Sequence, residues 1–235
     1  MPERFAIYYA PAITSPLWTR AAEWLGRDPA AGAVFDAGVA GLSRERLAAV
    51  TTSARRYGFH ATIKAPMALA DGISCSELEK TLTAFGLPRE QVSIGRLKLT
   101  LLEGFLALVP ERQSEALTRF AGECVAQFDR FRRPMTAAER DKRVHGGLSA
   151  YQIGLLDQYG YPYVMDQFLF HMTLSDRLDA ADREPIMRAA QAWFAPLLER
   201  EFVLDGLALF HEAAPGVPFA RLADFPLAVE VKVDA

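Results

Sequence analysis

Hydrophobic and polar residues alternate along two short segments of this chain, residues 59–63 (FHATI) and 170–174 (FHMTL). A period of two is typical of a strand with one buried face and one open face. In each segment the apolar residues occupy the buried face. The open face carries His60 and Thr62 in the first segment, and His171 and Thr173 in the second. The sequence therefore predicts two strands with matching polar faces.

Most of the remaining chain follows either helical or strand-like spacing. Ser15, Ser74 and Thr136 stand where helices are expected to begin, and Glu77 and Glu139 follow the last two at the distance of a capping box. Helical spacing covers residues 16–25, 43–54, 74–85, 112–128, 149–158 and 181–198. Further strands are expected over residues 4–10, 92–101, 104–109, 202–210, 218–222 and 227–233.

The order of these elements repeats roughly between the two halves of the chain. The first half reads strand, helix, His strand, helix, strand, strand, and the second half has a similar order. This pattern predicts an α+β fold with two lobes and a shared cleft lined by the two H-x-T strands. We expect residues 1–235 to form one bilobal domain with interleaved lobes, connected near residues 129–147.

Composition narrows the classes of function. The chain has 235 residues, of which 51% are hydrophobic and 23% charged, and its net charge is −3. These values are ordinary for a soluble globular protein, and they argue against binding of long nucleic acids. The start of the chain has no signal-peptide pattern and no stretch reaches 18 apolar residues, so we expect a cytoplasmic protein without membrane contact. The spacing of Cys75 and Cys124 fits neither a metal site nor a disulfide framework.

Two histidines facing one cleft suit phosphoryl chemistry. Imidazole titrates near neutrality, so one of His60 and His171 can act as a base while the other acts as an acid. The hydroxyls of Thr62 and Thr173 point the same way and can donate hydrogen bonds to phosphate oxygens. Such a site is expected to need no cofactor and no metal. The sequence does not indicate which histidine is the base.

Neighbouring residues suggest further contacts with a phosphorylated ligand. Lys64 has the same parity as His60, and Arg56 has it too if the strand extends that far back. Tyr57 lies beside them, and Gly58 leaves space for a phosphate. Near the second motif, Tyr163 is expected to reach the cleft from the preceding turn. We therefore predict that Lys64, Arg56, Tyr57 and Tyr163 bind substrate.

The two H-x-T motifs resemble those of the two-histidine (2H, LigT-like) phosphoesterase superfamily. The stretches 55–64 (RRYGFHATIK) and 161–174 (YPYVMDQFLFHMTL), with the start of the chain and residues 24–28 and 133–136, are similar to a branch of bacterial proteins associated with phosphonate-utilisation operons. The resemblance implies a pseudo-twofold bilobal fold, with His60 and His171 as the catalytic pair. It also implies hydrolysis of a cyclic phosphate or a 2′-linked phosphodiester. Leu169 departs from that branch, in which arginine often precedes the second Phe.

Other interpretations remain open at this stage. The cleft can belong to a binding module that senses a phosphorylated metabolite or an RNA end without turnover, or to a 2′-5′ RNA ligase-like transferase. A metal site built from both histidines and one acid lacks any supporting spacing. The basic run at residues 132–143 is either a solvated connection or a phosphate-binding lid over the cleft. We expect a monomer whose partner is a small phosphorylated substrate, either a cyclic sugar phosphate or a nucleotide.

Overall fold

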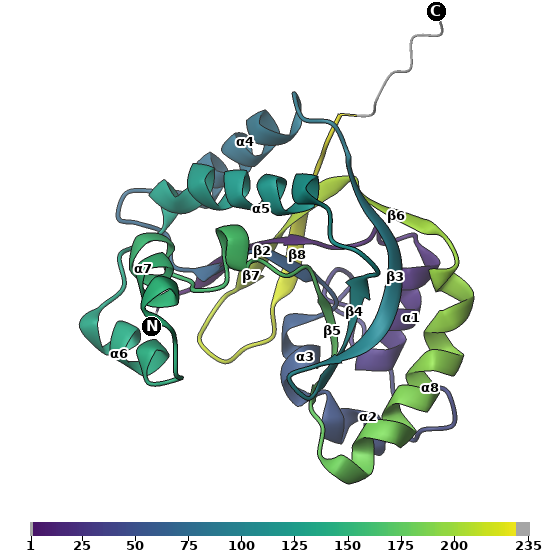
Figure 1. Cartoon of the computed structure of the whole chain (residues 1–235). Helices are drawn as coiled ribbons and strands as arrows, with labels where there is room; N and C mark the ends of the chain where they lie inside the picture. Colours follow the sequence, from purple (N-terminus) through teal and green to yellow (C-terminus); the bar gives the residue numbers. More distant parts are fainter. Residues whose placement is uncertain (1, 229–235) are drawn as a thin grey trace, which may run out of the picture.

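Eight strands form one curled sheet in the computed structural model, which describes residues 2–228 (Figure 1). Every pairing between these strands is antiparallel. The strands are β1 (Arg4–Tyr9), β2 (Ala61–Met67), β3 (Val92–Leu102), β4 (Phe105–Pro110), β5 (Met172–Arg177), β6 (Glu201–Leu204), β7 (Gly206–Glu212) and β8 (Ala220–Pro226).

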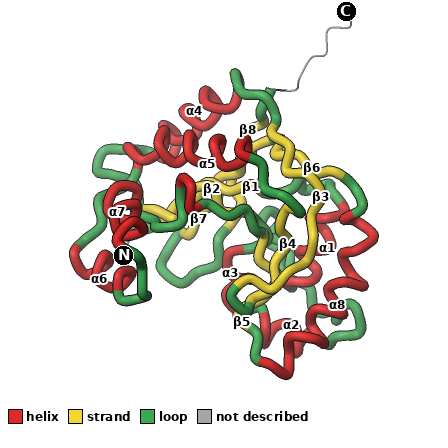
Figure 2. The backbone as a smooth tube through the Cα atoms, viewed as in Figure 1, coloured by secondary structure: helices red, strands yellow, loops and turns green. Residues whose placement is uncertain are grey.

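Helices lie in the connections from β1 to β2, β2 to β3, β4 to β5 and β5 to β6 (Figure 2). They are α1 (Pro16–Leu25), α2 (Arg44–Val50), α3 (Thr52–Tyr57), α4 (Cys75–Gly86), α5 (Glu115–Phe128), α6 (Ala137–Val144), α7 (Ala150–Tyr159) and α8 (Ala180–Leu198), with short 3-10 turns at Asp129–Phe131 and Met165–Gln167. None of the helices within residues 2–228 is long and apolar enough to cross a membrane.

The sheet consists of two four-stranded halves that meet at its centre. The strand order is β6-β3-β4-β5-β2-β1-β7-β8, so the two motif strands β5 and β2 are the central neighbours. They pair only through Ala61 and Met172, the first residue of each strand. Each half is a four-stranded antiparallel unit, and together they confirm the predicted α+β class with two antiparallel lobes.

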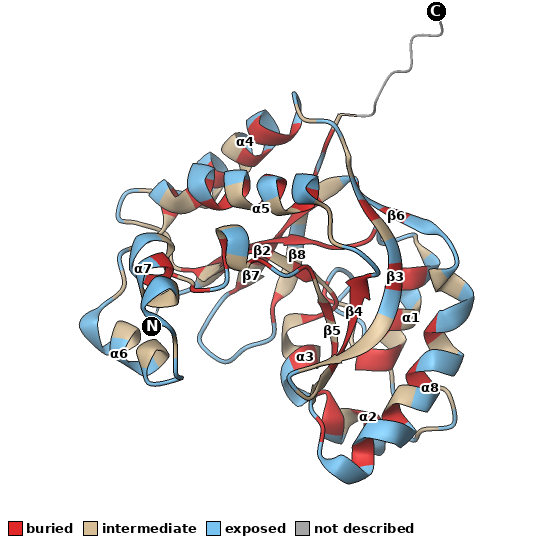
Figure 3. Ribbon diagram, viewed as in Figure 1, coloured by how far each residue is buried: buried red, intermediate tan, exposed pale blue. Residues whose placement is uncertain are grey.

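Helices cover each half on its buried face. Helix α4 packs on the half containing β7 and β8, and α1 and α8 pack on the half containing β3 and β5, whereas α5 contacts β2 of the first half and β3 of the second (Figure 1). One large apolar cluster runs through both halves, and Figure 3 shows the buried residues concentrated on the sheet and on the inner helix faces. Phe59, Ile63, Phe170 and Leu174 all belong to this cluster, as the alternating pattern predicted. The opposite face of the sheet is therefore left for His60 and His171.

The predicted elements mostly match the observed ones, with two differences. The single helix expected over residues 43–54 is two helices, α2 and α3, separated by Thr51 with φ −129° and ψ 17°. The strand expected over residues 202–210 is likewise two strands, β6 and β7, because the chain turns at Asp205. The predicted capping box at Thr136 begins α6, whereas at Ser74 the side chain accepts from the Glu77 N–H without the reciprocal bond of a capping box, and α7 begins with a further capping box at Ser149. The predicted last strand, residues 227–233, lies largely outside the described residues.

Candidate active site

The two H-x-T motifs lie side by side at the centre of the sheet. Ala61 pairs with Met172 in antiparallel register. One step further along each strand, this register puts His60 opposite Thr173 and Thr62 opposite His171. Directly opposed side chains on one face of a sheet have Cβ atoms about 4.5–5.5 Å apart. Extrapolated from this single bridge, the register sets each histidine across from the threonine of the other motif.

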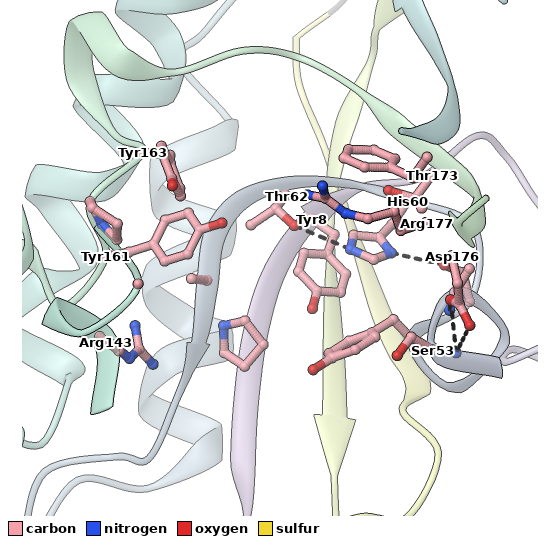
Figure 4. A pocket seen from close by; sticks show the side chains of 18 of the residues that line it. Tyr8, Ser53, His60, Thr62, Arg143, Tyr161, Tyr163, Thr173, Asp176 and Arg177 are labelled. Carbon is pink, nitrogen blue, oxygen red and sulfur yellow. Dashed lines mark hydrogen bonds between the residues drawn. The ribbon is translucent and has the colours of Figure 1, made fainter. Parts of the chain in front are cut away.

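A cavity of 840 Å³ opens on this face of the sheet (Figure 4). His60, Thr62 and Thr173 line it, whereas His171 is not among its lining residues and lies behind one of them, Phe105, with the two ring centroids 5.7 Å apart. In Figure 4, Arg143, Tyr161 and Tyr163 face these residues from the opposite side of the cavity. The cavity also includes Arg4, Tyr8, Ser53, Tyr57, Gly58, Ser175, Asp176 and Arg177. It is large enough for a small phosphorylated metabolite.

The imidazole of His60 is held in one orientation and kept neutral. Its Nδ1 donates to the carbonyl of Gly58 at 2.9 Å, because a carbonyl can only accept. The neutral ring therefore presents an unprotonated Nε2, which lies 3.2 Å from the hydroxyl of Thr62. The ring stacks on Tyr8 with centroids 3.7 Å apart. Burial, with a smaller contribution from the charge of His171, lowers the pKa of His60 to about 4.

His171 has a similar backbone bond in more open surroundings. Its Nδ1 donates to the carbonyl of Leu169 at 2.8 Å, so its Nε2 is also the atom left for chemistry. Phe105 is its aromatic neighbour, tilted at 55° rather than stacked. The charge of His171 acts on His60, which is consistent with the close approach of the two motifs. The pair thus combines an enclosed, neutral ring with a more accessible one.

The segment that carries His60 is fixed by α3 and by one glycine. Asp176 on β5 accepts hydrogen bonds from the backbone N–H groups of Ser53 and Ala54 at 3.0 and 3.1 Å, which satisfies donors at the start of α3. At the other end Gly58 adopts φ 81°, and a Cβ there would lie 2.6 Å from Pro29 Cγ. Gly58, which has no Cβ, can therefore adopt the backbone conformation that turns the chain from α3 into the motif, whereas most other residues cannot.

The structure corrects the prediction for Lys64. Its side chain is buried away from the cavity, with Nζ 3.1 Å from Asp129 and 3.3 Å from the carbonyl of Val125. Ile7 pairs with Lys64 whereas Tyr8 pairs with Thr62, so β2 has one extra residue at this point. A bulge of this kind shifts the alternation of side chains. The strict period of two that placed Lys64 beside Thr62 ends at the bulge.

The prediction that Arg56 lies on the His60 face and binds substrate is not met either. Its guanidinium bonds to Glu212, a buried carboxylate that Arg4 also contacts, and it is not among the residues that line the cavity. The reason is that residues 52–57 are helical, so strand parity does not extend back to Arg56. Arg56 and Arg4 neutralise Glu212 and tie α3 and β1 to β7.

Tyr57 and Tyr163 both line the cavity, at the positions where the sequence expected substrate contacts. Sequence reasoning missed Tyr8, Asp176 and Arg143. Tyr8 lies in an apolar run that reads as core, and Asp176 follows the second motif without any pattern of its own. Only the basic run at residues 132–143 gave a signal, for Arg143. Within the part of the chain that the structure describes, no three His, Cys, Asp or Glu residues are arranged to hold a metal ion.

Comparison with known proteins identifies the family. A family model described as "Protein of unknown function (DUF1045)" matches residues 62–220, which is more than half of the chain. The chain belongs to this family. The matched range includes Thr62 and the whole second motif, whereas His60 lies just before it.

Two curated relatives match a longer part of the chain than the family model does. The chain is 36% identical over 228 residues to the ribose 1,5-bisphosphate phosphokinase PhnN of Janthinobacterium sp. (strain Marseille), covering 95% of this chain and 50% of that protein. It is 34% identical over 222 residues to the protein of the same name from Laribacter hongkongensis (strain HLHK9), covering 92% and 50%. The chain thus spans about half the length of the curated relatives it matches.

Solved structures with a similar arrangement are also known. A structure described as a phosphoesterase has a TM-score of 0.43 and 13% identity, covering 97% of this chain and 99% of that one. E. coli LigT complexed with ATP has a TM-score of 0.38 and 11% identity, covering 97% and 98%.

Proposed function

We propose that this DUF1045 protein is a metal-independent phosphoesterase that opens a small cyclic phosphate. The observation that carries the proposal is the antiparallel pairing at Ala61 and Met172, which sets the two H-x-T strands side by side, with His60, Thr62 and Thr173 lining the cavity and His171 next to its lining residue Phe105. Two imidazoles and two hydroxyls around one phosphorus centre supply a base, an acid and donors for the charged oxygens.

In this mechanism His60 is the general base. Its pKa of about 4 keeps the ring neutral at physiological pH, and its Nδ1 bond to Gly58 makes Nε2 the proton acceptor once the Thr62 hydroxyl turns from Nε2 to a phosphate oxygen. A water molecule attacks phosphorus while His60 takes its proton. The new P–O bond forms with the water oxygen, and the ester P–O bond to the sugar breaks.

His171 is the general acid in the same step. Its protonated Nε2 gives a proton to the departing sugar oxygen, which leaves as a hydroxyl. Thr62 and Thr173 donate hydrogen bonds to the non-bridging oxygens, where negative charge increases in the transition state. After product release, one proton moves from His60 to solvent and another returns to His171, so the site is restored.

The names of the curated relatives support a phosphorylated pentose as substrate. Those proteins are described as kinases of ribose 1,5-bisphosphate, and this chain spans about half their length. The chain has no glycine-rich phosphate-binding loop, so we assign the kinase activity of those proteins to the half that it does not match. Hydrolysis of the ester bond to O2 in a 1,2-cyclic phosphate of ribose 5-phosphate would yield ribose 1,5-bisphosphate. We include the predicted link to phosphonate utilisation in this proposal.

The test is turnover of a panel of 1,2-cyclic and 2′,3′-cyclic phosphates in the presence of EDTA, followed by mass spectrometry of the products. We expect one class to gain the mass of one water, with the wild type far more active than His60→Ala. Equal rates for the two proteins would contradict the assignment of the site.

The rival interpretations give different results in the same assay. A binding module would show saturable affinity for a cyclic phosphate with no product, and would tolerate His60→Gln. A ligase would form product only when a second substrate with a free hydroxyl is added. Either result would replace hydrolysis as the function of the cavity.

A further inference from the structure

A second hollow adjoins the cavity at the end away from His60. It has a volume of 350 Å³ and shares the lining residues Arg4, Pro66 and Arg143 with the cavity, so the two spaces lie next to each other. Its remaining lining comes from the chain start, the end of β2 and the segment from residue 132 to α6. The space next to the two motifs is therefore longer than a single phosphate group requires.

The second hollow is strongly cationic. Glu139 is the one acidic side chain among the residues that line it. Five basic side chains line it as well: Arg4, Arg132, Arg133, Lys142 and Arg143. Three of the five are neutralised by carboxylates, since Arg4 pairs with Glu212, Arg132 with Asp129 and Arg133 with Glu139. Among residues 2–228, no carboxylate forms an ion pair with Lys142 or Arg143. Two positive charges in this hollow thus remain uncompensated.

Arg143 is the better placed of these two cations. Its Nη1 donates to the carbonyl of Gly160 at 2.6 Å, a bond that holds the side chain in place without cancelling its charge. It is half-buried, and it lines both the cavity and the hollow. A guanidinium held in this way keeps donors for an anion and loses little side-chain freedom on binding.

We propose that Arg143, assisted by Lys142, binds a second phosphate group on the same substrate molecule. This inference rests on the proposed function and defines its substrate class as a cyclic phosphate that also carries a phosphomonoester. A doubly charged phosphate at the end of the cavity lined by Arg143 would neutralise the two cations that the fold leaves unpaired. Arg143 is then a specificity-determining residue, and the basic run at residues 132–143 contributes it from α6.

The experiment compares matched pairs of substrates that differ only in the second phosphate. One pair is ribose 1,2-cyclic phosphate with and without a 5-phosphate. The other is a nucleoside 2′,3′-cyclic phosphate with and without a 5′-phosphate. We expect the wild type to prefer the phosphorylated member of at least one pair by about 10-fold or more in kcat/KM. The pair that shows the preference identifies whether the molecule is a sugar phosphate or a nucleotide.

Substitutions at Arg143 test the assignment directly. In Arg143→Ala the preference should fall to near 1, and in Arg143→Lys it should be intermediate because the charge remains but the bond to Gly160 is lost. Arg188→Ala is the matched control, because Arg188 lies on the exposed side of α8 and pairs with Glu184. It should keep the full preference. No preference in the wild type, or an unchanged preference in Arg143→Ala, would overturn the proposal.

A binding measurement separates this inference from the proposed function. If the wild type turns over none of the four compounds, the proposed function fails. Calorimetric titration with ribose 5-phosphate, compared with ribose, then tests the anion site alone. Binding that is at least about 10-fold weaker in Arg143→Ala would support the site. Equal binding by the two proteins, or binding by neither, would overturn it.

Discussion

The two H-x-T motifs have the same residues and the same backbone bond, yet their surroundings differ. His60 stacks on Tyr8 and has a pKa of about 4. His171 has only the tilted ring of Phe105 beside it. In both, Nδ1 donates to the carbonyl two residues earlier, which leaves Nε2 for the ligand. The backbone bonds are thus equivalent, whereas the burial of the rings is not.

This difference teaches how a duplicated motif can acquire two roles. Equivalent hydrogen bonds fix the same tautomer in both rings, so the motif itself does not distinguish base from acid. The aromatic neighbour and the depth of burial do, because burial disfavours the charged form of imidazole. The enclosed ring of His60 is therefore neutral at physiological pH, as a general base must be before the reaction, and the more open ring of His171 is left to supply the proton.

The largest expected effect comes from removing either histidine. His60→Ala and His171→Ala should each lower kcat/KM for a cyclic phosphate by about 10²–10⁴-fold, the usual contribution of a general base or acid. The two variants should differ with a substrate whose leaving group is a nitrophenolate, which needs no proton. His171→Ala should recover much of its activity there, whereas His60→Ala should not.

This rescue experiment distinguishes the two roles rather than only showing that both residues matter. If His60→Ala is the variant that recovers with the activated leaving group, the assignment of base and acid is reversed. If neither recovers, the two rings do not divide the proton transfers in the proposed way. Circular dichroism and thermal unfolding of both variants control for loss of the fold.

Removal of the threonine hydroxyls should have the next largest effect. Thr62→Val and Thr173→Val keep the shape of the side chain and remove a donor to the transition state, so we expect losses of about 10–10²-fold in kcat. Only Thr62 also bonds His60 Nε2, at 3.2 Å. Thr62→Val should therefore change the pH dependence as well, whereas Thr173→Val should lower the rate at every pH alike. Identical pH profiles for the two variants would contradict this difference between the motifs.

The alternating pattern predicted the motif pair correctly because it depends on burial of one sheet face. Phe59 and Phe170 must enter the core, and this requirement turns both histidines toward the other face. The prediction failed at Lys64 and Arg56, where a bulge in β2 and the end of α3 interrupt the strand. Such local breaks depend on tertiary pairing with β1 and β7, which a period of two does not encode.

Residues far from the motifs in sequence were the hardest to predict. Tyr8 has an apolar neighbour on each side and reads as core, and its contact with His60 exists only because β1 pairs with β2. Asp176 acts on α3 across more than a hundred residues of chain. Contacts of this kind arise from the strand order of the sheet, so the sequence of one motif contains no sign of them.

A third prediction concerns Tyr8 and the pH dependence. On the acid side of the pH–rate profile, kcat/KM of the wild type should decline only near pH 4, where His60 becomes protonated. Tyr8→Ala opens one face of the His60 ring to water, so its pKa should rise toward the ordinary value of 6.5. The decline should then begin at least about one pH unit higher.

Stability gives an independent measurement of the same shift. Because the folded pKa of His60 lies below its unfolded value, the neutral ring contributes stability above pH 6.5 that is lost as the pH falls toward 4. Tyr8→Ala should reduce that loss between pH 6.5 and 4, apart from its own cost in packing. A pH profile that is identical in Tyr8→Ala and the wild type would mean that stacking does not set the role of His60.

The smallest expected effect concerns the support of the first motif by the second strand. Asp176→Ala removes the acceptor of the Ser53 and Ala54 N–H groups, so α3 should fray at its start. Loss of such a cap costs about 1 kcal/mol of unfolding free energy. Because α3 leads through Gly58 to His60, we also expect a several-fold loss in kcat with little change in KM.

Asp179→Ala is the matched control, since Asp179 accepts from the backbone N–H of Asp182 at the start of α8 and does not line the cavity. Both variants should lose similar stability, and only Asp176→Ala should lose activity. Equal activity in the two would show that the rings hold their positions without this contact, and that the asymmetry between the motifs arises from Tyr8 alone.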